Sequence, residues 1–220
     1  MDVTKIEEKI NEKTKAIMVV HLFGHPVDMD PVLKISKKYN LKIIEDCAEA
    51  HGVEYKGKKV GSIGDIGAFS FYANKTFTCG EGGMIVTNSR ELTEKARSLK
   101  NLSYGKIDRF VHDDIGFNYR LPNISAAIGL GQFYQKDKIL LEKKRIYDRY
   151  KKNLKDIKGI NIPLVREWVT KYVMWVFNLH LDNNFPITRD ELVKKLDEEN
   201  IETRNSFVPI NKQNILIKKY

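Results

Sequence analysis

Two apolar runs joined by a helical segment constrain the fold most. Ala16-Ile-Met-Val-Val20 is typical of a strand covered on both faces, and Gly24 and Pro26 mark a loop after it. Asp30 to Tyr39 has the spacing of a helix with one apolar face, and Leu41 to Glu45 is a second buried strand. Strands joined in this way are normally parallel neighbours, so the sequence predicts an α/β fold.

The rest of the first two thirds continues this alternation. We expect strands at 68–71 and 84–87, a helix from Ser89 or Arg90 to Leu99, an irregular loop at 101–119, and a helical stretch at 123–154 with a break near Gly129 or Gly131. The predicted large domain, with a mostly parallel sheet flanked by helices, covers residues 1–133. A connecting long helix is predicted over 134–157.

A small, incomplete C-terminal α/β domain is predicted over 158–220. Tyr172 to Leu181 alternates apolar and polar residues, as in a strand with one buried face. Thr188-Arg-Asp-Glu191 is a capping box that opens a helix to about Asn200, and Ile201 to Arg204 is expected to form the following strand.

The charge balance is basic, with 38 Lys and Arg against 29 Asp and Glu, a net charge of +9. Basic residues alternate with acidic ones along the chain and form no arm, so a solvated surface is expected and nucleic-acid binding is not. A basic mouth that attracts a phosphate-bearing substrate fits the same excess. No apolar run approaches the ~20 residues of a membrane span, and no signal peptide opens the chain, so a cytoplasmic protein without membrane contact is expected.

Metal binding is not expected. Cys47 and Cys79 form no Cys-x-x-Cys pair and are interpreted as reduced thiols. His21 and His25 have the spacing of two helical zinc ligands, but Gly24 and Pro26 argue against a helix there.

Lys75 and Asp46 are the strongest candidates for chemistry. Each follows a predicted strand, and Asp46 lies at the edge where open α/β sheets bind ligands. A lysine amine can form a Schiff base with pyridoxal phosphate, and a carboxylate can keep the pyridine nitrogen of that cofactor protonated. Ser70 could donate to its phosphate. The alternatives are a surface lysine, an aspartate that caps a turn, and a small polar strand residue.

Several separated motifs then point to one family. The sequence resembles the sugar-nucleotide aminotransferases of the DegT/DnrJ/EryC1/StrS family, within the fold-type I pyridoxal phosphate enzymes, and most of all its GDP-perosamine synthetase subgroup. The matching stretches are 14–21, 44–50, 61–71, 74–76, 80–83, His112-Asp113, 118–120, Asn123, 126–129 and 201–204.

The resemblance implies a role for individual residues. Lys75 would be the Schiff-base lysine and proton shuttle, Asp46 would pair with the pyridine nitrogen, and Glu49 would lie by the cofactor ring. Ser70 would bind the phosphate of the same cofactor. Asn118 would reach the phosphate of the neighbouring subunit's cofactor, which implies a homodimer with shared active sites.

The resemblance also implies the substrates and the reaction. Glutamate would donate its amino group to the 4-keto carbon of a nucleotide-linked 4-keto-6-deoxy sugar, for polysaccharide biosynthesis, with Asn74 and Arg204 as substrate contacts. Relatives that dehydrate sugars have histidine at the lysine position, so Lys75 favours transamination. Perosamine-type enzymes usually follow the Thr-Arg pair with Pro-Phe-Phe, whereas Asn205-Ser-Phe207 stands here; this departure bears on the sugar.

The resemblance further predicts that the family's first quarter to third, and a short C-terminal piece, lie outside this chain. That first part contributes to cofactor phosphate binding in the family. The alternative to an enzyme is therefore a truncated or non-catalytic subunit that acts only in dimer association.

Overall fold

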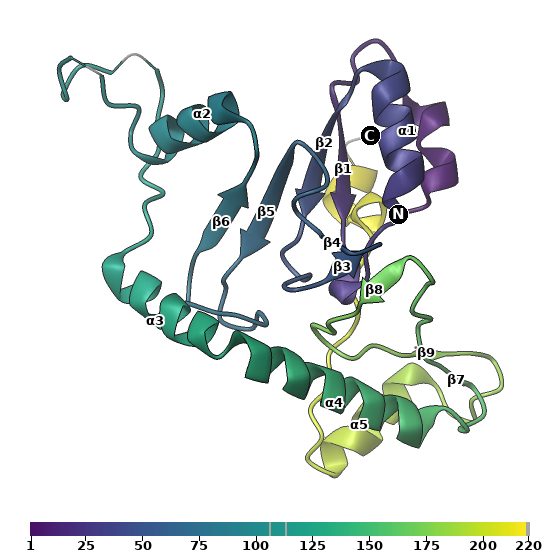
Figure 1. Cartoon of the computed structure of the whole chain (residues 1–220). Coiled ribbons are helices and arrows are strands. Elements are labelled where there is room, and N and C mark those ends of the chain that lie inside the picture. The colour runs from purple at the N-terminus through teal and green to yellow at the C-terminus, as the bar shows by residue number, and fades with distance from the viewer. Residues whose placement is uncertain (106, 113, 219–220) are drawn as a thin grey trace. The chain divides into compact units, whose positions relative to one another are not determined.

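The computed structural model of the protein describes residues 1–105, 107–112 and 114–218, which form two compact units (Figure 1). The first unit comprises residues 1–149 together with 165–177, and the second comprises 150–164 together with the residues from 178 onward. These two units do not test the domain limits expected at residues 133 and 157, which stay a prediction.

Within the described residues, a four-stranded sheet forms the centre of the first unit. Its strands, in spatial order, are β1 (Ala16–Val20), β2 (Lys42–Asp46), β5 (Ile66–Ser70) and β6 (Gly83–Val86). β1, β2 and β5 are parallel, and β6 runs antiparallel to β5. The sheet and its helices confirm the predicted α/β fold.

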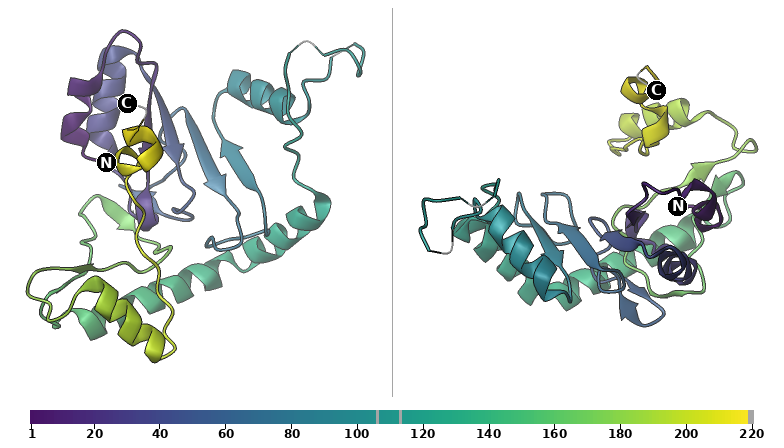
Figure 2. Two further views of the ribbon diagram at one scale, coloured as in Figure 1. Left: turned by 180° about the vertical axis from the view of Figure 1, so that it is seen from behind. Right: turned by 90° about the horizontal axis from the view of Figure 1, so that it is seen from above.

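Helix α1 (Met29–Tyr39) joins β1 to β2 and packs against both strands (Figures 1 and 2). Val19 of β1, Val32 of α1 and Ile43 of β2 are almost completely buried in one core. Burial of each such side chain contributes roughly 1.5–3 kcal/mol. The predicted strand–helix–strand unit is therefore confirmed to within one residue at each boundary.

The predicted burial of both faces of β1 is wrong for this chain. Ile17 and Val19 are buried, but Met18 and Val20 are 56% and 38% exposed. Successive side chains of a strand point to opposite faces, so one face of β1 packs on the core and the other is open to solvent.

The first unit also contains the antiparallel strands β3, β4 and β8, the helices α2 and α3, and most of helix α4, whose last turn belongs to the second unit. Their bounds are β3 (Glu54–Tyr55), β4 (Lys58–Lys59), β8 (Val169–Lys171), α2 (Arg90–Lys100), α3 (Asn123–Tyr134) and α4 (Lys136–Leu154). Short 3-10 helices cover Val3–Lys5, Glu7–Lys9 and Leu22–Gly24.

The loop at 101–119 follows α2 at the β6 edge of the sheet (Figure 1). Its described residues form neither a helix nor a strand, as predicted, and two isolated bridges, Asn101 to Asn118 and Tyr104 to His112, hold it. Asp113, part of a motif noted above, lies outside the described residues.

The helical stretch at 123–154 breaks at Gln135, and the predicted break near Gly129 or Gly131 is wrong. A Cβ at Gly129 would lie 3.3 Å from the Cys79 Cβ. The glycine therefore permits close helix packing against the loop at 71–82 and does not end the helix.

The predicted strand from Tyr172 to Leu181 is also wrong. β8 ends just before this stretch, and within it only the two residues of β9 (His180–Leu181) form a strand. The consecutive residues Val173, Met174 and Trp175 are all buried. Three buried neighbours in a row are incompatible with the two-residue period of a half-exposed strand. In the structure, the segment from Val165 to Phe177 is part of the first unit.

The second unit contains a two-stranded sheet of β7 (Ile160–Asn161) and β9, with helices α5 (Arg189–Glu198) and α6 (Asn214–Ile217) and a 3-10 turn at Ile210–Lys212. The capping box of α5 is confirmed, because the Thr188 hydroxyl accepts from the Glu191 N–H. The predicted strand at 201–204 is wrong: its residues are exposed, and no described strand pairs with them. None of the described helices combines the length and apolar character that crossing a bilayer requires.

Candidate active site

The candidate site lies at the carboxyl end of the parallel strands. β2 ends at Asp46, β5 ends at Ser70, and the loop between β5 and β6 carries Lys75. Val20 pairs with Asp46, and Asp46 pairs with Ala68, so the ends of the three strands lie in line. This is the edge at which open α/β sheets place ligands.

Lys75 has a largely buried side chain, with only 12% of it exposed. Its Nζ lies 4.0 Å from Glu49 Oε1 and 4.0 Å from the centroid of the Trp175 ring. A lysine buried to this degree is uncommon unless it is paired, so the contacts argue against the surface-lysine alternative.

Glu49 links the amine to the rest of the site. It is 8% exposed, and its Oε2 accepts a 2.8 Å hydrogen bond from the Phe23 N–H. Burial raises the pKa of Glu49 above its ordinary value, and the Asp46 carboxylate acts in the same direction. The Phe23 N–H and the Lys75 charge act in the opposite direction but do not cancel this rise. Asp46 and Lys75 therefore both act electrostatically on Glu49.

Phe23 has φ = 55°, which is unusual for a residue with a large side chain. This backbone conformation places its N–H on Glu49. Left-handed backbone at a non-glycine residue is a feature that clusters at functional sites.

Asp46 is half-buried, and its Oδ1 accepts a 3.0 Å hydrogen bond from the Ala48 N–H. Within the described residues no protein donor is found for Oδ2. One carboxylate oxygen is thus fixed by the backbone, and the other is open to a donor such as a pyridinium N–H.

The remaining predicted residues are placed differently. The Ser70 hydroxyl oxygen accepts a 3.3 Å hydrogen bond from Tyr72, and Asn74 is exposed but its carbonyl accepts from the Trp175 indole. Asn118 is exposed in the 101–119 loop, where it bridges to Asn101. Arg204 is exposed in the second unit. Asp46, Glu49 and Lys75 thus form one cluster, whereas the described contacts do not join Asn118 to it.

Glu45, next to Asp46, is fully buried in a dense set of hydrogen bonds. Its Oε2 accepts from His21 Nε2 at 3.0 Å and from the Gly61 N–H at 2.7 Å. Its Oε1 accepts from the Ile63 and Gly64 N–H groups at 2.8 and 2.6 Å. Burial acts to raise the pKa of Glu45, but these four donors outweigh it and hold the pKa below its ordinary value.

Two glycines allow this turn to reach Glu45. A Cβ at Gly67 would lie 2.4 Å from the Gly61 carbonyl oxygen, and Gly61 itself has φ = 87°. Backbone packs directly on backbone here, which only glycine permits. The glycines of the stretch at 61–67 therefore hold the turn that follows β4 against the end of β2.

His21, Glu45 and Cys47 bring ligand-type atoms within 4.8 Å of one another. His21 Nδ1 already accepts from the Val27 N–H, its Nε2 is engaged by Glu45, and Glu45 accepts four hydrogen bonds. Burial raises the pKa of the Cys47 thiol far above its ordinary value, which disfavours the thiolate that a metal requires. The cluster is explained by hydrogen bonding without a metal ion.

His51 is 4% exposed, and neither ring nitrogen has a hydrogen-bond partner among the described residues. Its ring packs against Phe69, Phe71 and Phe77, with centroids 5.5–5.7 Å apart. Burial lowers the pKa of His51 to about 4, and the nearby charge of Lys75 acts in the same direction. His51 is therefore neutral at physiological pH.

Acid is expected to destabilise the chain through His51. The unfolded histidine binds a proton near pH 6.5 and the folded one only near pH 4, so stability is complete above pH ~6.5 and falls as the pH drops to ~4. The expected loss is about 3 kcal/mol. Urea unfolding of wild type and His51→Phe across this range measures it.

The His51→Phe variant should show a flatter pH dependence of the free energy of unfolding than wild type. The exposed His180 offers the control, since His180→Phe should leave the wild-type slope intact. Equal slopes for wild type and His51→Phe would contradict the assignment of a buried neutral imidazole.

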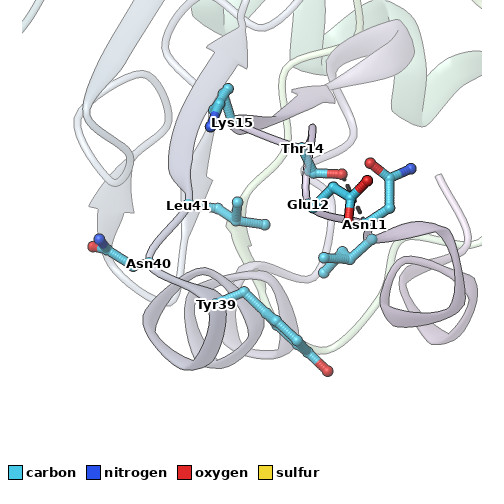
Figure 3. Close-up of a pocket in the computed structure, with 8 residues that line it drawn as sticks. Asn11, Glu12, Thr14, Lys15, Tyr39, Asn40 and Leu41 are labelled. Atoms are coloured by element: carbon cyan, nitrogen blue, oxygen red, sulfur yellow. Dashed lines mark hydrogen bonds between the residues drawn. The ribbon is translucent and has the colours of Figure 1, made fainter.

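A surface hollow of about 520 Å³ lies elsewhere on the first unit (Figure 3). Lys15 and Leu41, which line it, come directly before β1 and β2. They are thus at the amino ends of these strands, whereas Asp46 and Ser70 are at the carboxyl ends. The hollow is not part of the candidate site.

Sequence reasoning missed Trp175, which contacts Lys75, and His51, whose pKa is lowered by burial and by the charge of Lys75. Trp175 lies 100 positions after Lys75 in the chain, within a stretch expected to be a strand of the small domain. His51 follows Asp46 closely, but nothing in the local sequence indicates that its nitrogens are left without partners. Both depend on tertiary packing, which local patterns do not contain.

The residues present fit pyridoxal phosphate. The cofactor needs an amine for its aldehyde, an acid for its pyridine nitrogen and donors for its phosphate. The Lys75 amine, the open Asp46 oxygen and the Ser70 hydroxyl have these properties at one edge of the sheet.

Comparison with known proteins also indicates similarity to aminotransferases. The chain is 43% identical over 220 residues to the GDP-perosamine synthase of Escherichia coli O157:H7, covering 100% of this chain and 59% of that protein. It is 39% identical over 206 residues to the dTDP-4-amino-4,6-dideoxy-D-glucose transaminase of Shigella dysenteriae, covering 94% and 55%. Helicobacter pylori PseC, an aminotransferase involved in the biosynthesis of pseudoaminic acid, has a similar structure, with a TM-score of 0.91, 29% identity, and coverage of 99% and 59%.

The chain spans between half and two thirds of the length of these relatives. The likeness to PseC confirms the aminotransferase fold that the sequence predicted. The DegT/DnrJ/EryC1/StrS aminotransferase family matches over residues 1–220. The chain therefore belongs to the DegT/DnrJ/EryC1/StrS aminotransferase family.

Proposed function

We propose that the chain provides the reactive lysine of a pyridoxal phosphate-dependent sugar aminotransferase. The substrate is a nucleotide-linked 4-keto-6-deoxy sugar, glutamate is the amino donor, and the product serves surface polysaccharide biosynthesis, as in a perosamine synthase-like enzyme. The observation that carries the proposal is the position of the buried Lys75 amine. It lies 4.0 Å from Glu49, at the edge of the sheet where β2 ends with Asp46. The names of the relatives support a sugar substrate.

Because the chain covers 59% of the GDP-perosamine synthase that it resembles, the activity, substrates and partners of the whole protein are all part of the proposal. The expected cytoplasmic location stays a prediction.

Each residue of the cluster has a role in this proposal. When bound, pyridoxal phosphate supplies an electron sink for the carbon that loses a proton. Lys75 would bind the aldehyde and, when released, transfer a proton as general base and then acid. Asp46 would keep the pyridine nitrogen protonated, Glu49 would lie beside the ring, and Ser70 would donate to the phosphate.

The substrate contacts follow from the resemblance. Asn74 is adjacent to Lys75 and exposed, so its side chain is available to a sugar; Arg204 is exposed and could pair with a diphosphate. The net charge of +9 favours an anionic nucleotide-linked substrate over a neutral one.

The proposal includes a homodimer in which Asn118 reaches the cofactor phosphate of the second copy. Asn118 is exposed and has no described contact with the Lys75 cluster of its own chain, as a residue that acts across an interface requires. Helix α3, which follows closely, contains no buried residue, and its Ile124 and Tyr134 are 78% and 77% exposed. An exposed apolar helix favours association.

Transfer of labelled nitrogen tests the function directly. The purified chain is incubated with pyridoxal phosphate, ¹⁵N-glutamate and a GDP- or dTDP-linked 4-keto-6-deoxy sugar, and the sugar product is analysed by mass spectrometry. The expected result is a 4-amino sugar that carries the label, together with 2-oxoglutarate.

Other outcomes separate the alternatives. If a cofactor adduct forms but no labelled sugar appears, the proposed sugar substrate is wrong and the proposed aminotransferase activity is retained. Absence of any cofactor adduct, in a chain that still forms dimers at micromolar concentration, would favour the non-catalytic subunit.

A further inference from the structure

Trp175 makes more contacts with the Lys75 loop than any role assigned so far explains. It is 6% exposed, and the Lys75 Nζ lies 4.0 Å from its ring centroid. Its indole N–H donates a 2.8 Å hydrogen bond to the carbonyl of Asn74, the residue before Lys75. One side chain thus contacts both the backbone that carries the lysine and the lysine amine itself.

The Trp175 ring is itself held in place. It stacks on Phe23, with ring centroids 6.4 Å apart and planes 14° from parallel. Offset stacking at this distance is favourable. The Phe23 N–H donates to Glu49, so the residue behind the tryptophan also fixes the carboxylate that faces Lys75.

The segment that carries Trp175 is anchored to the first unit on both sides. β8 pairs with β3, and Trp168 donates its indole N–H to the Pro26 carbonyl at 3.1 Å. At the other end, the Lys143 ammonium donates to the Trp175 carbonyl at 2.9 Å. Trp175 is therefore a fixed surface against which the lysine rests.

We propose that Trp175 is a positioning residue for Lys75. A lysine ammonium is attracted to the face of an indole ring, and the attraction increases when the pair is removed from water. The ring therefore holds the free amine beside Glu49 and shields it from solvent. Under the proposed function, on which this part rests, Trp175 is the place to which the amine returns whenever it is not bound to cofactor.

Acylation of Lys75 tests the inference without cofactor. The chain is treated briefly with a limiting amount of an amine-acylating reagent, and the peptide that contains Lys75 is quantified by mass spectrometry against the peptide of the exposed Lys13. Trp175→Leu removes both the ring and the N–H donor, so acylation of Lys75 should rise by about 3- to 30-fold.

Two further variants make the result specific. Trp175→Phe keeps an aromatic face but loses the hydrogen bond to Asn74, so its acylation rate should lie between those of wild type and Trp175→Leu, and it serves as the test if the leucine variant does not fold. Trp168→Phe is the matched control, because Trp168 also donates to a backbone carbonyl while no lysine is described over its ring. An unchanged Lys75 rate in both folded Trp175 variants would overturn the inference.

Trapping of the cofactor separates this inference from the proposed function. The same proteins are incubated with pyridoxal phosphate and reduced with borohydride, and the adduct on Lys75 is measured. Faster acylation in the Trp175 variants, with no adduct even in wild type, retains the positioning role and refutes the function. An adduct in wild type with equal acylation rates in all variants refutes the positioning role alone.

Discussion

Replacement of Lys75 by arginine is expected to abolish both the cofactor adduct and amino transfer. Arginine keeps the positive charge and can lie over the Trp175 ring, but its guanidinium stays protonated and does not condense with the aldehyde. General acid–base catalysis by a positioned side chain contributes about 10²- to 10⁴-fold, and loss of the covalent linkage adds to this. The measurement is the borohydride-trapped peptide, followed by the labelled-sugar assay.

Lys56→Arg is a matched control for this experiment. The Lys56 amine also lies over an aromatic ring, 5.5 Å from the Tyr55 centroid, but it is exposed and paired with Asp30. The control should therefore behave as wild type. An adduct that persists in Lys75→Arg, or that maps to another lysine in wild type, would refute the assignment of Lys75.

The sequence identified the parts of the site that depend on strand ends. Asp46 and Ser70 end β2 and β5, and Lys75 follows in the next loop. Since parallel strands end at one edge, their proximity was predictable. The contact between Lys75 and Trp175 joins segments 100 positions apart, and no local pattern indicated it. The roles of these residues stay proposals.

The same distinction applies to the fold. The strand–helix–strand unit was predictable, because its pattern depends on neighbouring residues whose burial the unit itself supplies. The stretch from Tyr172 to Leu181 alternates like a strand, but it packs as an irregular segment in which Val173, Met174 and Trp175 are all buried. Tertiary packing therefore determined the conformation of this stretch, against its local strand propensity.

Replacement of Glu45 by alanine is expected to cause a large loss of stability. Four donors would lose their acceptor: three backbone N–H groups and the buried His21. Removal of one partner from a buried charged set costs about 3–5 kcal/mol, a large part of the ~5–15 kcal/mol that stabilises a typical domain. Urea unfolding monitored by circular dichroism gives the free energy of unfolding for comparison with wild type.

Glu94→Ala is the control, since Glu94 is paired with Arg90 on the surface, and exposed pairs contribute about 0–1 kcal/mol. Glu45→Gln should fall between the two, because one amide oxygen can still accept while the NH₂ group faces donors. The folded pKa of Glu45 is lowered, so its contribution is complete above the ordinary carboxyl pKa and is lost as the pH falls through the folded value. Equal losses for Glu45→Ala and Glu94→Ala would show that this network does not hold the end of β2, and with it Asp46, in place.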